Sequence, residues 1–307
     1  DLAIGRDADG TLTIADGGTV TSLAGRIGYS LNTNGTVTVT GTGSAWSNGS
    51  DLHIGYFGTG HLTITAGGSV SSLTTVLGSN AGSTGTLDLL GGAADGRGVL
   101  ETGQIVAGPG GATLNLNGGM LRATRDEIKY LDGFTTLTIG SNGAFIDSNR
   151  HTIGIATDLS GSGSLTKLGA GTLTLSGTNS HTGDTVIAAG RLVGDSVGSF
   201  SLDSNVTIAA GATLEITSSA FVGTIGSLSG AGAVEIGAGA TLITGWNDAS
   251  RTFSGSFAGD GALGFTGAGT QIYTGTGTLG GGFITCACTG GEFVIRGGSL
   301  TFGDDVQ

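Results

Sequence analysis

The chain has 307 residues, of which 65 are glycine and one is proline. It carries 11 basic and 23 acidic residues, a formal net charge of −12, and only 11% of its residues are charged. Because a surface that binds phosphates needs clustered Lys and Arg, the sequence excludes nucleic acid and an anionic membrane surface from the expected partners.

The sequence contains no apolar run of about 20 residues that could span a membrane, and no signal peptide. It opens inside a repeat at Asp1 and stops at Gln307, just after a strand-like run. We therefore expect an excised segment of a longer protein, and the missing targeting signals say nothing about its location.

The first hundred residues repeat with a period of 50. Residues 1–45 and 51–95 share 17 identical positions without a gap. Turn propensity alone does not keep register over such a length, so this is an internal repeat. A fixed period in this range is typical of solenoids, propellers and other repeat arrays.

Short alternating runs separated by glycines continue from the repeats to the C-terminus. In Gly10–Ile14 the apolar Leu12 and Ile14 share one face and the two threonines share the other, which predicts a half-buried strand. The same pattern recurs at residues 35–39, 113–116, 136–139, 171–175, 206–208, 211–216, 233–236, 240–243 and 292–295.

The pattern predicts an all-β fold, a single right-handed parallel β-helix (β-solenoid) over residues 1–307. One coil of such a helix takes roughly 20–25 residues, so the 50-residue unit corresponds to two coils. A β-propeller is the main alternative, but it needs four longer strands in each repeat and usually a Trp or Asp signature, which are absent here.

One segment, Arg122–Phe134, breaks this pattern with six charged residues in thirteen positions. We expect it to leave the coil as a loop or a single helical turn. It is either a solvated loop folded onto the solenoid or a protrusion that contacts a ligand, because function concentrates in loops on rigid scaffolds. The candidate contact residues are the long or aromatic ones: Arg122, Arg125, Asp126, Glu127, Lys129 and Tyr130.

Residues 161–193 resemble the passenger-associated transport repeat of bacterial autotransporters (type V secretion). Its pattern is a glycine-rich core with Leu-Thr-Lys and Gly-Thr-Leu-Thr-Leu-Ser-Gly, then an Asn-x-x-x-Gly-x-Thr turn and Ala-Gly-x-Leu. The matching positions are Gly163, Leu165, Thr166, Lys167, Gly169, residues 171–177, Asn179, Gly183, Thr185, Ala189 and Gly190.

Two other stretches extend the resemblance. Residues 1–100 resemble parts of large autotransporter adhesins, and residues 253–307 contain degenerate repeat coils that lack the lysine. The resemblance implies a cell-surface passenger on the extracellular side of the outer membrane, carried there by a C-terminal β-barrel absent from this sequence. That barrel would be the only link to the membrane.

The resemblance also implies adhesion, with a host-cell surface, an extracellular-matrix protein or glycan, or an identical passenger on another cell as partner. A structural stalk that displays another domain is the alternative. A carbohydrate-active hydrolase is less favoured, because the acidic residues are scattered and no nucleophile elbow is present. Regular threonine ladders also raise the alternative of an ice-binding solenoid, although the repeats vary in content.

Two cysteines, Cys286 and Cys288, are the only pair in the chain. The distance between the Cα atoms at positions i and i+2 of a strand is near the upper limit for a disulfide. A bridge therefore needs a turn at Ala287. An extracellular setting favours oxidation, and free buried thiols are the alternative. We expect no metal site and no cofactor, since neither the four histidines nor Asp7–Gly10 follow a metal-binding spacing.

Overall fold

The structure is a computed structural model that describes residues 1–92, 96–217, 222–285 and 290–303. It forms β-strands and no helix within these ranges, and the strands of its main sheets are parallel. The predicted all-β parallel β-helix is therefore confirmed. Cys286 and Cys288 lie outside the described residues, and the predicted disulfide stays a prediction.

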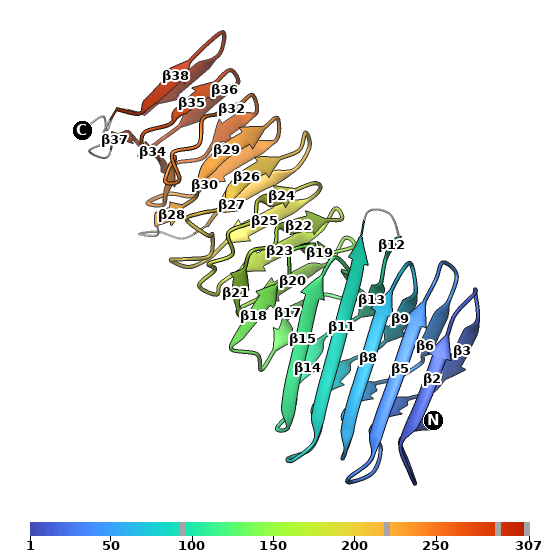
Figure 1. Ribbon diagram of the computed structural model, residues 1–307. Coiled ribbons are helices and arrows are strands. Elements are labelled where there is room, and N and C mark those ends of the chain that lie inside the picture. Colours follow the sequence, from blue (N-terminus) through green and yellow to red (C-terminus); the bar gives the residue numbers. More distant parts are fainter. Residues whose placement is uncertain (93–95, 218–221, 286–289, 304–307) are drawn as a thin grey trace. The chain divides into compact units, whose positions relative to one another are not determined.

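The chain divides into two compact units, Asp1–Ile153 and Gly154–Gln307, here called the N-terminal and C-terminal units. Both are built from short parallel strands (Figure 1). The prediction of one continuous domain over the whole chain stays a prediction.

Each coil of the N-terminal unit contributes one strand to each of three parallel sheets. The first sheet contains β1 (Leu2–Ile4), β4 (Gly25–Ile27), β7 (Leu52–Ile54), β10 (Thr75–Leu77), β14 (Ile105–Ala107) and β17 (Glu127–Asp132). The second, here called the long-strand sheet, contains β2 (Gly10–Ile14), β5 (Asn34–Thr40), β8 (Thr59–Thr65), β11 (Thr84–Gly92), β15 (Gly111–Asn117) and β18 (Thr136–Ile139). The third contains β3 (Thr19–Ser22), β6 (Ala45–Asn48), β9 (Ser69–Ser72), β13 (Val99–Thr102), β16 (Met120–Ala123) and β19 (Ala144–Asp147).

The register explains the repeat of this unit. Gly10, Gly35, Gly60 and Gly85 are partners in successive coils, so one coil takes 25 residues and the 50-residue repeat is two coils. Glycine is required where the coils turn closely past one another. A Cβ on Gly85 would lie 2.0 Å from the carbonyl oxygen of Ile54. This distance is a steric clash, so no other residue fits at this position without a shift of the backbone.

Alternation along the strands separates core from surface as the sequence predicts. Val37, Val39, Leu62 and Ile64 are fully buried, while the threonines between them point outward. Burying such side chains stabilises the fold by about 1.5–3 kcal/mol each, an upper estimate relative to an extended chain. The core is therefore a narrow column that every coil extends by a few apolar residues.

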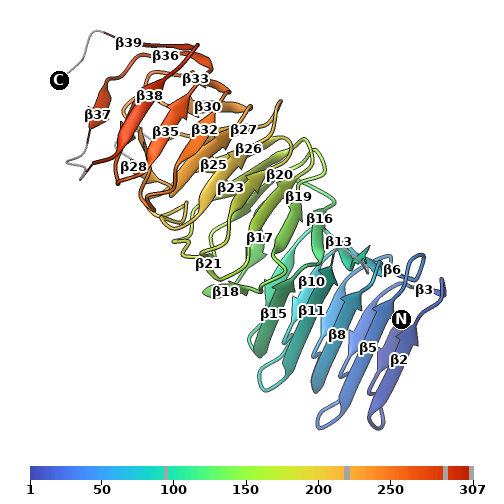
Figure 2. The ribbon, with the colours of Figure 1, turned by 45° about the horizontal axis from the view of Figure 1, so that its top comes forward.

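The C-terminal unit follows the same plan with shorter coils (Figure 2). Leu173, Leu192, Leu214, Val234 and Phe257 are successive partners in one sheet, so a coil takes 19 to 23 residues. That sheet contains β23 (Thr172–Leu175), β25 (Arg191–Gly194), β27 (Thr213–Ile216), β30 (Ala233–Ile236), β33 (Ser256–Ala258), β36 (Thr276–Leu279) and β39 (Ser299–Phe302).

Two further sheets complete the unit. One contains β22 (Leu165–Leu168), β24 (Thr185–Ile187), β26 (Asn205–Ile208), β29 (Ser227–Gly230), β32 (Arg251–Phe253), β35 (Thr270–Tyr273) and β38 (Glu292–Ile295). The other contains β28 (Val222–Thr224), β31 (Thr241–Thr244), β34 (Ala262–Phe265) and β37 (Phe283–Thr285). β21 (Asp158–Gly161) also belongs to this unit, and β20 (Thr152–Ile155) contains the division between the units.

The predicted excursion at Arg122–Phe134 is wrong. β16 and β17 account for most of the segment, and both pair in parallel with strands of neighbouring coils. Among the described residues of this unit, β12 (Gly96–Arg97) leaves the coil instead, and it pairs antiparallel with the end of β11. Arg97 anchors β12 by two contacts. Its guanidinium lies 3.3 Å from the centre of the Phe145 ring and donates to the carbonyl of Gly118.

Candidate functional site

Arg122, the first predicted contact residue, belongs to an ion-pair ladder on the third sheet. Its Nη1 lies 2.8 Å from Glu101 Oε1 and its Nε lies 2.9 Å from Asp147 Oδ2. Glu101, Arg122 and Asp147 are register partners on three successive coils. The arginine therefore balances two carboxylates that would otherwise repel each other.

Replacing Arg122 by glutamine should lower the free energy of unfolding by about 0.5–1 kcal/mol. The effect is small because Arg122 and Glu101 are each more than one-third exposed, so solvent screens the charge of the arginine. Chemical denaturation of both proteins at low and at high salt measures it. The difference should shrink at high salt, and a salt-independent loss would show that packing, rather than charge, carries the effect.

The other predicted contact residues lie on the turn before β17 and on β17 itself. Asp126 is exposed, and its Oδ1 accepts from the backbone N–H of Thr152 and lies 3.2 Å from His151 Nδ1. Both contacts lower the pKa of Asp126, and the hydrogen bond from Thr152 has the larger effect. Glu127 Oε1 accepts from the backbone N–H of Lys129, whose own side chain is exposed.

Tyr130 is different, because its ring is fully buried and burial raises the pKa of its hydroxyl. It therefore packs in the core and does not offer its ring to the surface. Arg125 is half-buried and lies 3.8 Å from Glu127 Oε2, and the neighbouring Ile128 is 78% exposed. The surface part of the predicted site is thus the short stretch Arg125–Lys129.

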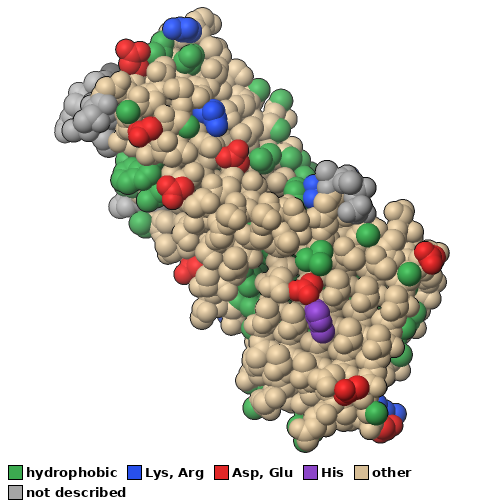
Figure 3. Space-filling model, viewed as in Figure 1, with side chains coloured by type: hydrophobic (Ala, Val, Ile, Leu, Met, Phe, Trp, Pro, Cys, Tyr) green, Lys and Arg blue, Asp and Glu red, His purple; other side chains and the backbone are tan. Residues whose placement is uncertain are grey.

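The outer face of the long-strand sheet carries rows of side chains in register. One row runs Thr11, Thr36, His61, Thr86, Thr113, and the next runs Thr13, Thr38, Thr63, Asp88, Asn115. Uncharged polar side chains and backbone dominate the view in Figure 3, with scattered charges. The face is thus a threonine array whose later coils carry carboxylate and amide groups.

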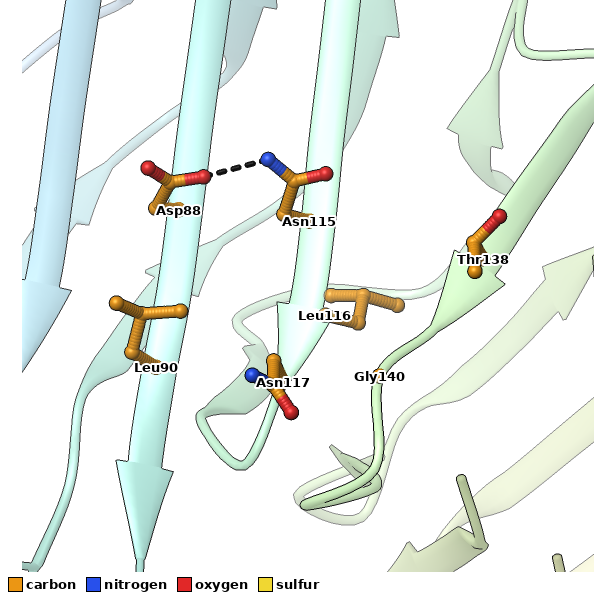
Figure 4. A pocket seen from close by; sticks show the side chains of 7 residues that line it. All are labelled: Asp88, Leu90, Asn115, Leu116, Asn117, Thr138 and Gly140. Carbon is orange, nitrogen blue, oxygen red and sulfur yellow. Dashed lines mark hydrogen bonds between the residues drawn. The ribbon is translucent and has the colours of Figure 1, made fainter. Parts of the chain in front are cut away.

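This sheet splits at its last step within the unit. β15 matches β11 over seven register pairs but is paired with β18 only at Leu116 and Ile139. The two strands diverge from that point, as Figure 4 shows. Outward side chains next to the split are exposed, whereas the equivalent side chains on β8 are half-buried between their neighbours.

Three adjoining hollows, two at the split and one beside it over the ends of β8 and β11, are together called the split-sheet groove. Their volumes are about 400, 360 and 250 Å³. The middle one is lined by the residues in Figure 4: Asp88, Leu90, Asn115, Leu116, Asn117, Thr138 and Gly140. Phe134 and Thr136 border the groove at one end and Asn142 at the other.

A chain of hydrogen bonds fixes the polar groups of the groove. His61 Nε2 lies 2.6 Å from Asp88 Oδ2, and Asn115 Nδ2 donates to Asp88 Oδ1 over 2.5 Å. Asn117 Oδ1 accepts from the backbone N–H of Asn142 over 2.9 Å. Both carboxylate oxygens of Asp88 are thereby occupied, while the amide oxygen of Asn115 points toward β18 (Figure 4).

Asp88, Asn115 and Asn117 are not among the site residues predicted from the sequence. A signal was present, because positions 13, 38 and 63 are threonine and the next positions in the same row are Asp88 and Asn115. A change of residue type at an outward position that otherwise repeats could have marked the place. The split itself has no such local signal.

The transport-repeat segment places its polar residues inside the C-terminal unit. Lys167 is fully buried, and its Nζ donates to the carbonyls of Leu168, Gly169 and Ala189 at 2.7, 2.7 and 3.1 Å. Asn179 is buried and joins two further coils, accepting from the N–H of Leu159 and donating to the carbonyl of Ser199. These side chains hold backbone groups together and are not available to a ligand.

His181 lies in the same interior. It is buried, its Nε2 lies 3.0 Å from Thr185 Oγ1, and Thr185 in turn lies 2.8 Å from Ser204 Oγ. Its Nδ1 has no hydrogen-bond partner within the part of the chain that the structure describes. Burial lowers the pKa of His181 from 6.5 to about 4.

Among the described residues, no cluster of three or more His, Cys, Asp or Glu side chains could hold a metal ion. Nor does that part of the chain contain a helix long and apolar enough to cross a membrane.

Comparison with known proteins shows what the chain is similar to. Residues 165–193 match the family described as passenger-associated transport repeat. Together with the stacked parallel strands, this match and the relative below confirm the resemblance to autotransporter passengers. Over 207 residues, 63% of its length, it is 32% identical to the adhesin BmaC autotransporter of Brucella suis biovar 1 (strain 1330).

The chain spans only 6% of the length of that relative. No solved structure matches it.

Proposed function

We propose that this segment acts in adhesion on the extracellular side of the bacterial outer membrane. The observation that carries the proposal is the outer face of the long-strand sheet, a broad array of hydroxyl and amide groups that opens into the split-sheet groove. The similarity to a protein named as an adhesin and autotransporter supports it. The expected partner is a host-cell surface, a matrix protein or glycan, or an identical passenger.

This proposal assigns no enzymatic role to the segment. The name of the relative, an adhesin, supports that assignment. The polar groups of the groove are engaged in orienting one another, as Asp88 is by His61 and Asn115, which suits recognition.

Binding of the purified segment to host cells, to matrix proteins and to bacteria that display it tests the proposal. Saturable binding to one of these surfaces is the expected result. A segment that binds none of them acts as a stalk that displays another domain. Turnover of polysaccharide or ester substrates would instead establish a hydrolase.

The stretch Arg125–Lys129 gives a further prediction. If it contacts the partner, replacing Arg125, Asp126, Glu127 and Lys129 by alanine should reduce binding at least tenfold at an unchanged melting temperature, since their long side chains offer anchoring area. Titration of the immobilised partner with each protein measures it. Unchanged binding would remove the stretch as a contact site, and a lowered melting temperature would assign it a packing role.

A further inference from the structure

We propose that the split-sheet groove binds an uncharged glycan chain. The inference rests on the proposed adhesive function and names the ligand class. The groove is accessible because β15 and β18 are paired only at Leu116 and Ile139, so side chains beside the split are open to solvent from the side. On β5, β8 and β11 the corresponding side chains are half-buried between neighbouring coils.

The charges of the groove favour a neutral ligand. None of the described residues that line it is Lys or Arg, so it offers nothing to pair with phosphate, sulfate or a carboxylate. Its one carboxylate, Asp88, has both oxygens engaged by His61 and Asn115. These contacts partly satisfy the carboxylate, so it attracts a cationic ligand less than a free carboxylate would.

The remaining polar groups match vicinal hydroxyls. Asn115 has used an amide hydrogen on Asp88, which leaves its Oδ1 as an acceptor facing the groove (Figure 4). Asn117 has used its Oδ1 on Asn142, which leaves its Nδ2 as a donor. The two residues project about 7 Å apart along β15, and the Thr138 hydroxyl across the groove both donates and accepts.

Apolar surface completes the arrangement. Leu90 lies on one side of the middle hollow and Phe134 borders the next one. A sugar ring presents C–H groups on its faces and hydroxyls at its edge, so it fits a groove with apolar flanks and amide groups between them. The groove is shallow, and adhesion would gain strength from many displayed copies rather than from one tight site.

An extended peptide added to the open edge of β15 is the competing occupant. The Leu116–Ile139 pair closes the gap at one end, so only the preceding residues of β15 remain open to a new strand. A glycan uses the side chains instead and needs no continuous strand edge. The side-chain pattern therefore favours the glycan.

The experiment compares the chain of residues 1–307 with two variants on immobilised neutral gluco-, galacto- and manno-oligosaccharides and their sulfated and sialylated counterparts. One variant, Asn115→Leu with Thr138→Val, changes the groove. The control, Thr38→Val with Thr63→Val, changes the same face away from the split. We expect binding to neutral glycans, at least tenfold weaker in the groove variant and unchanged in the control.

A lowered melting temperature in the groove variant would move the comparison to Thr138→Val alone, which alters one exposed hydroxyl and should still weaken binding severalfold. Equal binding by wild type and groove variants overturns the inference. For cells, periodate treatment, which cleaves vicinal diols, should abolish binding. Binding that survives periodate but not protease overturns the glycan and favours a peptide, while the adhesive function stands. Failure to bind any cell or matrix surface overturns the adhesive function itself.

Discussion

Replacing Lys167 by methionine should lower the free energy of unfolding by about 3 kcal/mol. Methionine keeps the apolar stem but removes the ammonium, whose three hydrogens serve three carbonyl oxygens: those of Leu168, Gly169 and Ala189. These acceptors belong to half-buried residues and would lose the donor that they share. Chemical unfolding monitored by circular dichroism measures the loss.

The chain contains its own control, since its only other lysine, Lys129, is exposed. Lys129→Met should change stability by less than about 0.5 kcal/mol. If both variants unfold at the same denaturant concentration, the buried ammonium contributes no net stability, and its desolvation cost cancels its hydrogen bonds. Lys167→Arg should not rescue stability, because a planar guanidinium cannot direct three donors to one convergent set of carbonyls.

Acidification should destabilise the C-terminal unit through His181. Its folded-state pKa is lowered from 6.5 to about 4, so the unfolded chain binds the proton more readily between these values. The stability it contributes is fully present above pH 6.5 and is lost as the pH falls toward 4. A difference of about 2.5 pH units corresponds to about 3 kcal/mol.

The physical reason is that the protonated ring must place a charge in the interior, with no acceptor for its Nδ1 among the described residues. Unfolding free energies at pH 7 and pH 4.5 should therefore differ much less in His181→Gln than in the wild type. His151→Gln, which alters a half-exposed histidine, should keep the wild-type dependence. An unchanged pH dependence in His181→Gln would assign it to other groups, such as His53, whose pKa burial also lowers.

The fold could be predicted because its signals lie in short stretches of the sequence. Leu12 and Ile14 alternate with threonines in the sequence, and their partners recur every 25 residues on β5, β8 and β11. The segment Arg122–Phe134 was misread because its charges suggested a solvated loop. Arg122 is instead neutralised by Glu101 and Asp147 on the adjacent coils, residues more than twenty positions away that a local pattern does not connect.

The site was harder to predict than the fold for the same reason. The match to the transport repeat located Lys167 and Asn179, but their burial depends on which face of the coil turns inward. The groove depends on the divergence of β15 from β18, and no residue type in either strand predicts that divergence. Features that arise between coils are visible only in three dimensions.

The 25-residue step that relates β2, β5, β8 and β11 bears on how such a protein changes length. A duplicated block of whole coils reproduces the same glycine corners and the same partners above and below it, so it inserts without a new kind of interface. An insertion of one residue in a strand would turn its leucines outward and its threonines inward. The 17 positions shared by residues 1–45 and 51–95 are what a gene duplication of two coils would leave behind, and duplicating such a block lengthens the unit while the alternation of its strands is kept.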